Sequence, residues 1–224
     1  MNRKINILFA FVLITLVVSG CVTSFSGRSP TTVLYRIKGQ VKNGVYYSPD
    51  KNFSCPLPAF VGAGTAVIDK SEIVQGGIMG TVGFDGEEGD LYRIEWIEIT
   101  PEQQAQLKET QMQRVMLEAA RSYELNMFRS LSPKVTIEYE ETTGEGDKAE
   151  KFFVLYASEA ANIGSNTKRY NSIRGFLIFI KGGWVYTLST QDTAPFRSQT
   201  ETPEVRNARL KAELEKFSQT ISFN

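Results

Sequence analysis

The residues best suited to chemistry in this sequence form a run of carboxylates. Asp85, Glu87, Glu88 and Asp90 fall within six positions and have glycines between them. Calcium takes several hard oxygen ligands, and glycines allow a loop to wrap around an ion. The spacing lacks the alternating acidic positions and the later glutamate of an EF-hand loop. Because the run falls between two predicted strands, we expect a solvated turn and keep a metal site as the alternative.

Catalytic groups of the usual kinds are scarce in the rest of the chain. None of the 224 residues is histidine, so Ser-His-Asp and Cys-His chemistry as normally built is excluded. Glu138, Glu140 and Glu141 resemble paired catalytic carboxylates, but the first two alternate with apolar residues and predict the solvent-exposed face of a strand. Gly62-Ala63-Gly64 begins like a phosphate-binding loop but lacks its third glycine and its lysine. We therefore expect neither an enzyme nor a bound cofactor.

The two cysteines have different predicted roles. Two are too few for a thiolate zinc site or a disulfide framework. Cys55 alternates with Phe53 and Leu57, which indicates a small buried side chain rather than a reactive thiol. Cys21 closely follows the apolar segment Ile5–Val18. As a helix this segment would span roughly 21 Å, less than a bilayer core of about 30 Å, so it is typical of a cleaved secretory signal.

The residues up to Cys21 point to lipid attachment. Val18-Ser19-Gly20-Cys21 resembles a bacterial lipobox, in which an aliphatic residue and two small residues precede an obligatory cysteine. The resemblance implies removal of residues 1–20, diacylglycerol on the Cys21 thiol and a further acyl chain on the new amino group. Two or more chains anchor a protein stably, since each buried methylene adds about 0.8 kcal/mol. Val22 in place of aspartate favours the outer membrane, with the protein facing the periplasm.

The charge balance argues against nucleic acid as a partner. The chain has 25 basic and 25 acidic residues, and loss of Arg3 and Lys4 with residues 1–20 leaves 23 against 25, a formal net charge of −2. Nucleic-acid binders need a dense basic face instead. Residues 21–32 are rich in small polar residues and predict a flexible tether. Residues 33–224 are enough for a single domain.

Alternating patterns and turn residues predict an α+β domain with a mostly antiparallel sheet and helices packed on it. Thr100 and Gln103 form a capping box before a helix that continues to about Phe128, and Thr202-Pro203 opens a final helix with an apolar face. That face contains Val205, Leu210, Leu214, Phe217 and Ile221. The predicted strands are Val33–Gly39, Val45–Tyr47, Phe53–Pro58, Thr65–Ile68, Ile78–Phe84, Leu91–Ile99, Val135–Glu141, Phe152–Tyr156, Ile173–Ile180 and Trp184–Leu188.

Several short motifs in this pattern resemble PsbP-like and Mog-like domains. They are Phe53–Pro58 after a turn, Gly175-Phe176, the turn Lys181-Gly182-Gly183, Tyr186–Leu188 and the terminal Ser222-Phe223. The resemblance implies an α/β/α sandwich, an antiparallel sheet between helices. Such domains mostly bind other proteins and share no known catalysis, so the resemblance does not settle function.

The segment 157–172 has no apolar period and predicts a long loop that contains Lys168, Arg169 and Tyr170. Long loops often bind partners, so this loop and the acidic run are the places where we expect an interaction surface. The sequence thus favours a lipid-anchored, non-enzymatic accessory or interaction protein of the bacterial envelope with an unknown protein partner. The alternative is an envelope module that binds a small ligand or a metal ion.

Overall fold

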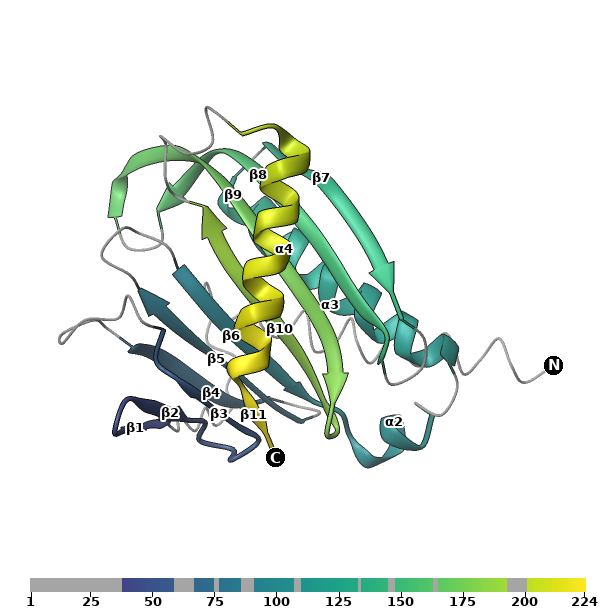
Figure 1. The fold of residues 1–224 in the computed structure, drawn as a ribbon. Coiled ribbons are helices and arrows are strands. Elements are labelled where there is room, and N and C mark those ends of the chain that lie inside the picture. The colour runs from purple at the N-terminus through teal and green to yellow at the C-terminus, as the bar shows by residue number, and fades with distance from the viewer. Residues whose placement is uncertain are drawn as a thin grey trace, which may run out of the picture.

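Within the described residues, strands form two antiparallel sheets (Figure 1). The computed structural model describes residues 38–58, 67–74, 77–85, 91–106, 110–132, 134–144, 148–162, 165–192 and 201–224. Its elements, in chain order, are β1 (Gln40–Lys42), β2 (Val45–Tyr47), β3 (Phe53–Pro56), β4 (Val67–Val74), β5 (Gly77–Asp85), β6 (Leu91–Glu98), α2 (Pro101–Gln106), α3 (Thr110–Leu131), β7 (Lys134–Thr143), β8 (Glu150–Asn162), β9 (Ser165–Lys181), β10 (Trp184–Asp192), α4 (Pro203–Thr220) and β11 (Ser222–Phe223).

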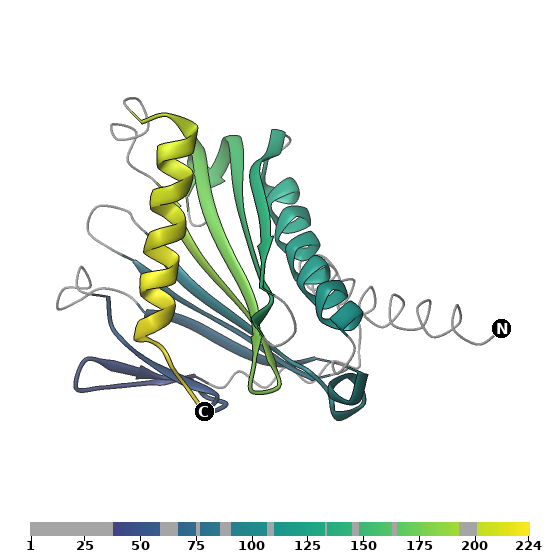
Figure 2. The ribbon, with the colours of Figure 1, turned by 45° about the vertical axis from the view of Figure 1, so that its right-hand side comes forward.

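The larger sheet has the order β4-β5-β6-β10-β9-β8-β7, and the smaller one has the order β1-β2-β3-β11. Helices α3 and α4 lie on opposite faces of the larger sheet (Figure 2). This arrangement confirms the predicted α+β class with a mostly antiparallel sheet. None of the helices within the described residues is long and apolar enough to cross a bilayer.

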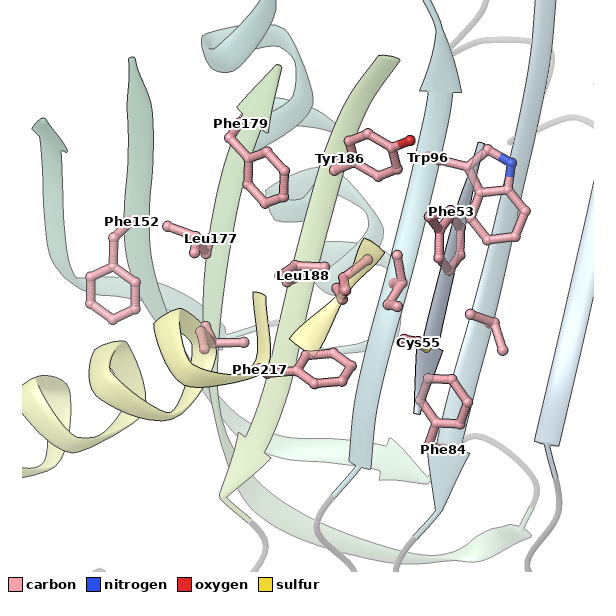
Figure 3. Close-up of a cluster of buried hydrophobic side chains, with 14 of the residues drawn as sticks. Phe53, Cys55, Phe84, Trp96, Phe152, Leu177, Phe179, Tyr186, Leu188 and Phe217 are labelled. Atoms are coloured by element: carbon pink, nitrogen blue, oxygen red, sulfur yellow. The ribbon is translucent and has the colours of Figure 1, made fainter. Parts of the chain in front are cut away.

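The face of the large sheet toward α4 is apolar, and the small sheet shares its core (Figure 3). Phe53 of β3 meets the Trp96 ring edge-on, with ring centroids 5.1 Å apart. The indole nitrogen of Trp96 donates a hydrogen bond of 2.7 Å to Asp50, so the polar edge of this buried ring is satisfied. Phe217 of α4 packs in the same core, 4.9 Å from Tyr92 between ring centroids. One continuous cluster thereby joins the helix and both sheets.

The opposite face packs against α3. Phe176 of β9 stacks on Phe153 of β8 with 4.7 Å between ring centroids, and Phe128 of α3 meets Phe176 edge-on at 5.6 Å. Leu117 and Leu125 of the helix are buried in the same cluster. Strands β8, β9 and β10 are therefore buried on both faces.

Local signals in the sequence locate the turns and helix starts correctly. Asn43 and Gly44 have φ values of 51° and 74°, the mirror-image turn predicted for this hairpin. Thr100 and Gln103 form the predicted capping box: each backbone N–H donates to the other side chain, at 2.9 and 3.4 Å. Thr202 caps α4 as predicted, since its hydroxyl accepts from the backbone N–H of Val205.

Some predicted boundaries are wrong. The first described strand is Gln40–Lys42 rather than a strand ending at Gly39, and residues 33–37 lie outside the described part. The single helix predicted up to Phe128 is two helices, α2 and α3. The sequence pattern predicts Val205 on the apolar face of α4, but this residue is 56% exposed. It lies in the first turn of the helix, where the buried residues are Arg206 and Asn207.

Gly80 tests the packing of the two sheets. It lies opposite Trp96 in the β5–β6 ladder, and a Cβ on Gly80 would overlap the indole ring. We expect Gly80→Ala to lower the free energy of unfolding by about 1–3 kcal/mol, because the buried ring must shift. Thr81→Ala, the next residue on the opposite face, should have the smaller effect. Urea denaturation measures both, and equal effects would contradict this packing.

Candidate functional site

Charged and polar side chains interrupt the sheet face toward α3. Ile94 and Trp96 of β6 belong to the apolar core on the α4 side, so the alternation of the strand places Arg93 and Glu95 on the α3 side. On β10, Ser189 lies opposite Arg93 in the ladder. We call the following group the buried charged cluster: Arg93, Glu95, Glu124, Arg174 and Gln191.

Glu124 is the centre of this cluster. It projects from α3 and is fully buried. The guanidinium Nη2 of Arg93 lies 3.0 Å from its Oε2, and Nε of the same arginine lies 3.4 Å from Oε1 of Glu95. A buried carboxylate is costly unless it is paired. One arginine therefore holds two carboxyl groups, one from the sheet and one from the helix.

Arg174 of β9 completes the cluster on its other side. The residue is buried, and its Nη2 donates to Oε1 of Gln191, the residue opposite it on β10. Its guanidinium carbon lies 5.1 Å from the centre of the Phe128 ring, a distance at which a cation is attracted to an aromatic face. The hydroxyl of Ser189 is buried beside these groups and has no hydrogen-bond partner among the described residues. The cluster thus combines opposite charges with a helix that covers them.

The proton affinity of Glu124 is strongly altered. Burial raises the pKa of its carboxyl well above the ordinary value of 4.5, and the nearby Glu95 raises it further, whereas Arg93 opposes the shift. A raised carboxyl pKa is the property required of a general acid. Glu124 has no exposed surface, however, so a substrate would reach it only if α3 moved. The geometry fits a structural ion network better than an open catalytic pair.

Sequence reasoning missed this cluster, although weak signals were present. Arg93 and Glu95 alternate with the buried Ile94 and Trp96 and share the other strand face with Ile97, an unusual mixture of charged and apolar residues on one face. Glu124 falls at helical spacing between Ala120 and Phe128, which are both buried. A charge inside an apolar stripe is the signal that could have found it.

The acidic run is only partly within the described residues. Asp85 is the last residue of β5, whereas Glu87, Glu88 and Asp90 lie outside the described part, as do Cys21 and the Gly62–Gly64 segment. Within the ranges that the structure describes, no group of three or more Cys, Asp or Glu side chains is placed to hold a metal ion. The metal alternative therefore stays a prediction.

The predicted loop at 157–172 is wrong. Strand β8 continues to Asn162 and β9 begins at Ser165, so Lys168, Arg169 and Tyr170 belong to a strand. The sequence of this hairpin lacks the apolar alternation that marks half-buried strands, which is why it was not recognised.

The two regions predicted as interaction surfaces begin at the same end of the large sheet. Asp85 pairs with Leu91 at the end of β5, and the next residue, Tyr92, pairs with Thr190 of β10. Two residues further, β10 ends opposite Ile173 of β9. The acidic run and the hairpin that contains the basic residues thus leave the sheet at one rim.

The three glutamates of β7 pair with cations on both sides of the strand. Glu138 and Glu140 are exposed, as predicted, but the prediction that they share one strand face is wrong. Glu138 pairs with Arg206 of α4, and Glu141 pairs with Lys211 of α4. Glu140 instead pairs with two cations on the α3 side, Arg121 at 2.7 Å and Lys151 at 2.6 Å. The cause is a register shift between residues 137 and 139, because a bulge reverses which face the following residues occupy.

Cys55 is buried, as predicted. Burial raises the pKa of its thiol to about 12. Since the thiolate is the reactive form, this side chain is chemically inert in the folded protein.

Comparisons with known proteins give limited information. No family model matches the chain, and no curated protein matches it. Among solved structures, it is similar to the solution structure of cyanobacterial PsbP (CyanoP) from Synechocystis sp. PCC 6803, with a TM-score of 0.43 and 12% identity, covering 90% of this chain and 99% of that chain. Similarity at this level supports no statement about activity or partner. The sheet order and packing themselves define the class, an α+β domain whose large sheet has helices on both faces.

Glu124→Gln tests the buried charged cluster through the pH dependence of stability. A carboxyl whose pKa is raised by folding stabilises the folded state fully below about pH 4.5, and this stabilisation is lost as the pH rises through the raised pKa. Glutamine mimics the protonated form. We therefore expect the unfolding free energy of the variant, relative to the wild type, to rise as the pH increases above about 4.5, as measured by urea denaturation.

Asn126→Ala is the matched control, since Asn126 is an exposed residue of the same helix and does not ionise. Its difference from the wild type should stay constant with pH. A constant or falling difference for Glu124→Gln would contradict the raised pKa.

Proposed function

We propose that the protein is a lipid-anchored, non-enzymatic accessory or interaction protein of the bacterial cell envelope. The single observation that carries the proposal is the N-terminal sequence, in which a positive start, an apolar segment and small residues lead to Cys21. That order is typical of a cleaved signal followed by a lipid attachment site. Residues 21–32 then serve as the tether, and the domain faces the periplasm from the outer membrane.

The chemistry of the cysteines supports the assignment of the lipid to Cys21. The chain has two cysteines, and Cys55 lies in the core with 1% of its surface exposed. A thiol with a pKa near 12 in an aromatic core is a packing group rather than an attachment point. Cys21 is therefore the residue to which the acyl chains are assigned.

The packing of the domain supports an interaction role. Strands β8, β9 and β10 are buried on both faces. The glutamates of β7 form ion pairs with arginines of α3 and α4. The surfaces left for a partner are the outer sides of the helices, the sheet edges and the rim where Asp85 and Ile173 lie. Binding at such sites suits a protein partner, and nucleic acid is disfavoured by the charge balance.

Removal of the attachment thiol tests the anchor. We expect Cys21→Ser to move the protein from the membrane fraction to the soluble periplasmic fraction, because no acyl chain then enters the bilayer. Cys55→Ala is the matched control and should stay with the membranes. The measurement is immunoblotting of fractionated cells; membrane retention of Cys21→Ser would defeat the proposal.

A thiol count tests the same assignment on the wild-type protein. When protein purified from membranes is unfolded in denaturant, a thiol reagent should find one free thiol per chain, that of Cys55. In the native state it should find none at neutral pH, because Cys55 is buried and protonated. Two thiols per unfolded chain would show that Cys21 is unmodified.

A further inference from the structure

The hairpin of β1 and β2 has an outer face that points away from the core. Figures 1 and 2 show the small sheet at the end of the molecule where α4 ends. Tyr46 of β2 lies in the core, so strand alternation places its neighbours Val45 and Tyr47 on the outer face of this sheet. Lys42 of β1 pairs with Val45 and lies on the same face.

Three lysines give this hairpin a positive charge. Lys42 precedes the turn of the hairpin, while Lys38 and Lys51 lie in the chain just before β1 and after β2. All three are exposed, and within the described part of the chain none of them forms an ion pair. The one acidic residue in the range 38–58 is Asp50, whose carboxylate accepts the hydrogen bond of the buried Trp96. We call residues 38–51 the basic hairpin.

Exposed apolar side chains accompany the lysines. Among the described residues four large apolar side chains are exposed, and two of them belong to the basic hairpin, Val41 at 48% and Tyr47 at 46%. Tyrosine and lysine side chains have an apolar body and a polar tip, which suits them to the boundary between lipid headgroups and acyl chains. Basic residues together with aromatic ones are the composition of segments that lie in a membrane interface.

The position of the basic hairpin in the chain brings a bilayer within its reach. Only residues 22–37 separate Lys38 from Cys21, the proposed lipid attachment site. A flexible chain of this length has an average end-to-end distance of about 20–25 Å, whereas a domain of about 190 residues is about 40 Å across. The end of the domain that contains Lys38 should therefore face the bilayer. A weak attraction is effective there, because the connecting chain keeps the local concentration of lipid high.

We infer that the basic hairpin docks on the anionic phospholipid surface of the membrane to which the protein is anchored. The inference rests on the proposed lipid anchor for its location, and it adds a second contact that fixes which side of the domain faces the bilayer. Each lysine near an anionic surface strengthens binding by about fivefold. Tyr47 adds an apolar contact among the headgroups.

Headgroup cross-linking tests the inference on the lipidated wild-type protein. The protein is extracted from bacterial membranes and reconstituted in vesicles of phosphatidylglycerol, and in matched vesicles of phosphatidylcholine, each with a photoreactive analogue of its own lipid. In the anionic vesicles, we expect mass spectrometry to locate most cross-links in residues 38–51. Replacement by phosphatidylcholine should lower this signal at least about fivefold, and so should about 1 M salt, where the screening length is about 3 Å.

Charge reversal tests which residues make the contact. Lys42→Glu combined with Lys51→Glu should lower cross-linking of the basic hairpin in phosphatidylglycerol vesicles at least about tenfold, because two attractive charges become repulsive. The control, Arg114→Glu combined with Arg129→Glu, makes the same charge change on exposed residues of α3 and should match the wild type. Both variants should stay on the vesicles through the lipid on Cys21.

Failure of the docking surface and failure of the anchor give different results. Cross-links spread evenly over the domain or concentrated on another face, equal yields in the two lipids, or equal yields for the variant and its control would each overturn the docking inference and leave the anchor in place. Protein that washes off the vesicles would overturn the anchor, and this inference with it.

Discussion

Burial of the same strands from two sides is the constraint on which the rest of this structure depends. Strands β8, β9 and β10 lie between α3 on one face and α4 with the small sheet on the other. Where these strands lie between the helices, their side chains must be accommodated by apolar packing or by pairing with a polar or charged group. On the face toward α4, these strands carry aromatic and aliphatic residues. The packing there is so close that Gly80 of the neighbouring β5 lies directly against the Trp96 ring. At Gly175, likewise, a Cβ would come within 3.2 Å of Leu210 on α4.

The face toward α3 contains charged side chains that pair with one another, in addition to apolar residues. Glu124 enters the interior from the helix and is held by Arg93, while Arg174 is held by Gln191 and by the ring of Phe128. Breaking such a group by removal of one partner is costly, because it leaves a buried charge uncompensated. The register of α3 on the sheet is thereby tied to a few ionic contacts. Burial likewise raises the pKa of the Cys55 thiol and shields it from solvent.

Features set by neighbouring residues could be predicted from the sequence, whereas features set by distant ones could not. The turn at Asn43-Gly44, the capping box at Thr100 and the hairpin around Gly182-Gly183 depend on local backbone preferences, and all three were found where expected. The buried charged cluster depends on residues from one helix and three strands meeting in space. The bulge in β7 placed Glu138 and Glu140 on different strand faces, and polar composition hid the end of β8 and the start of β9.

The intact mass of the protein extracted from bacterial membranes tests the central claim, the lipid anchor, most directly. We expect a chain that begins at Cys21 and ends at Asn224, with the added mass of a diacylglyceryl group and one further acyl chain. Fragmentation should place that added mass on the first residue. A mature chain without added hydrocarbon, or one that still contains residues 1–20, would contradict the account.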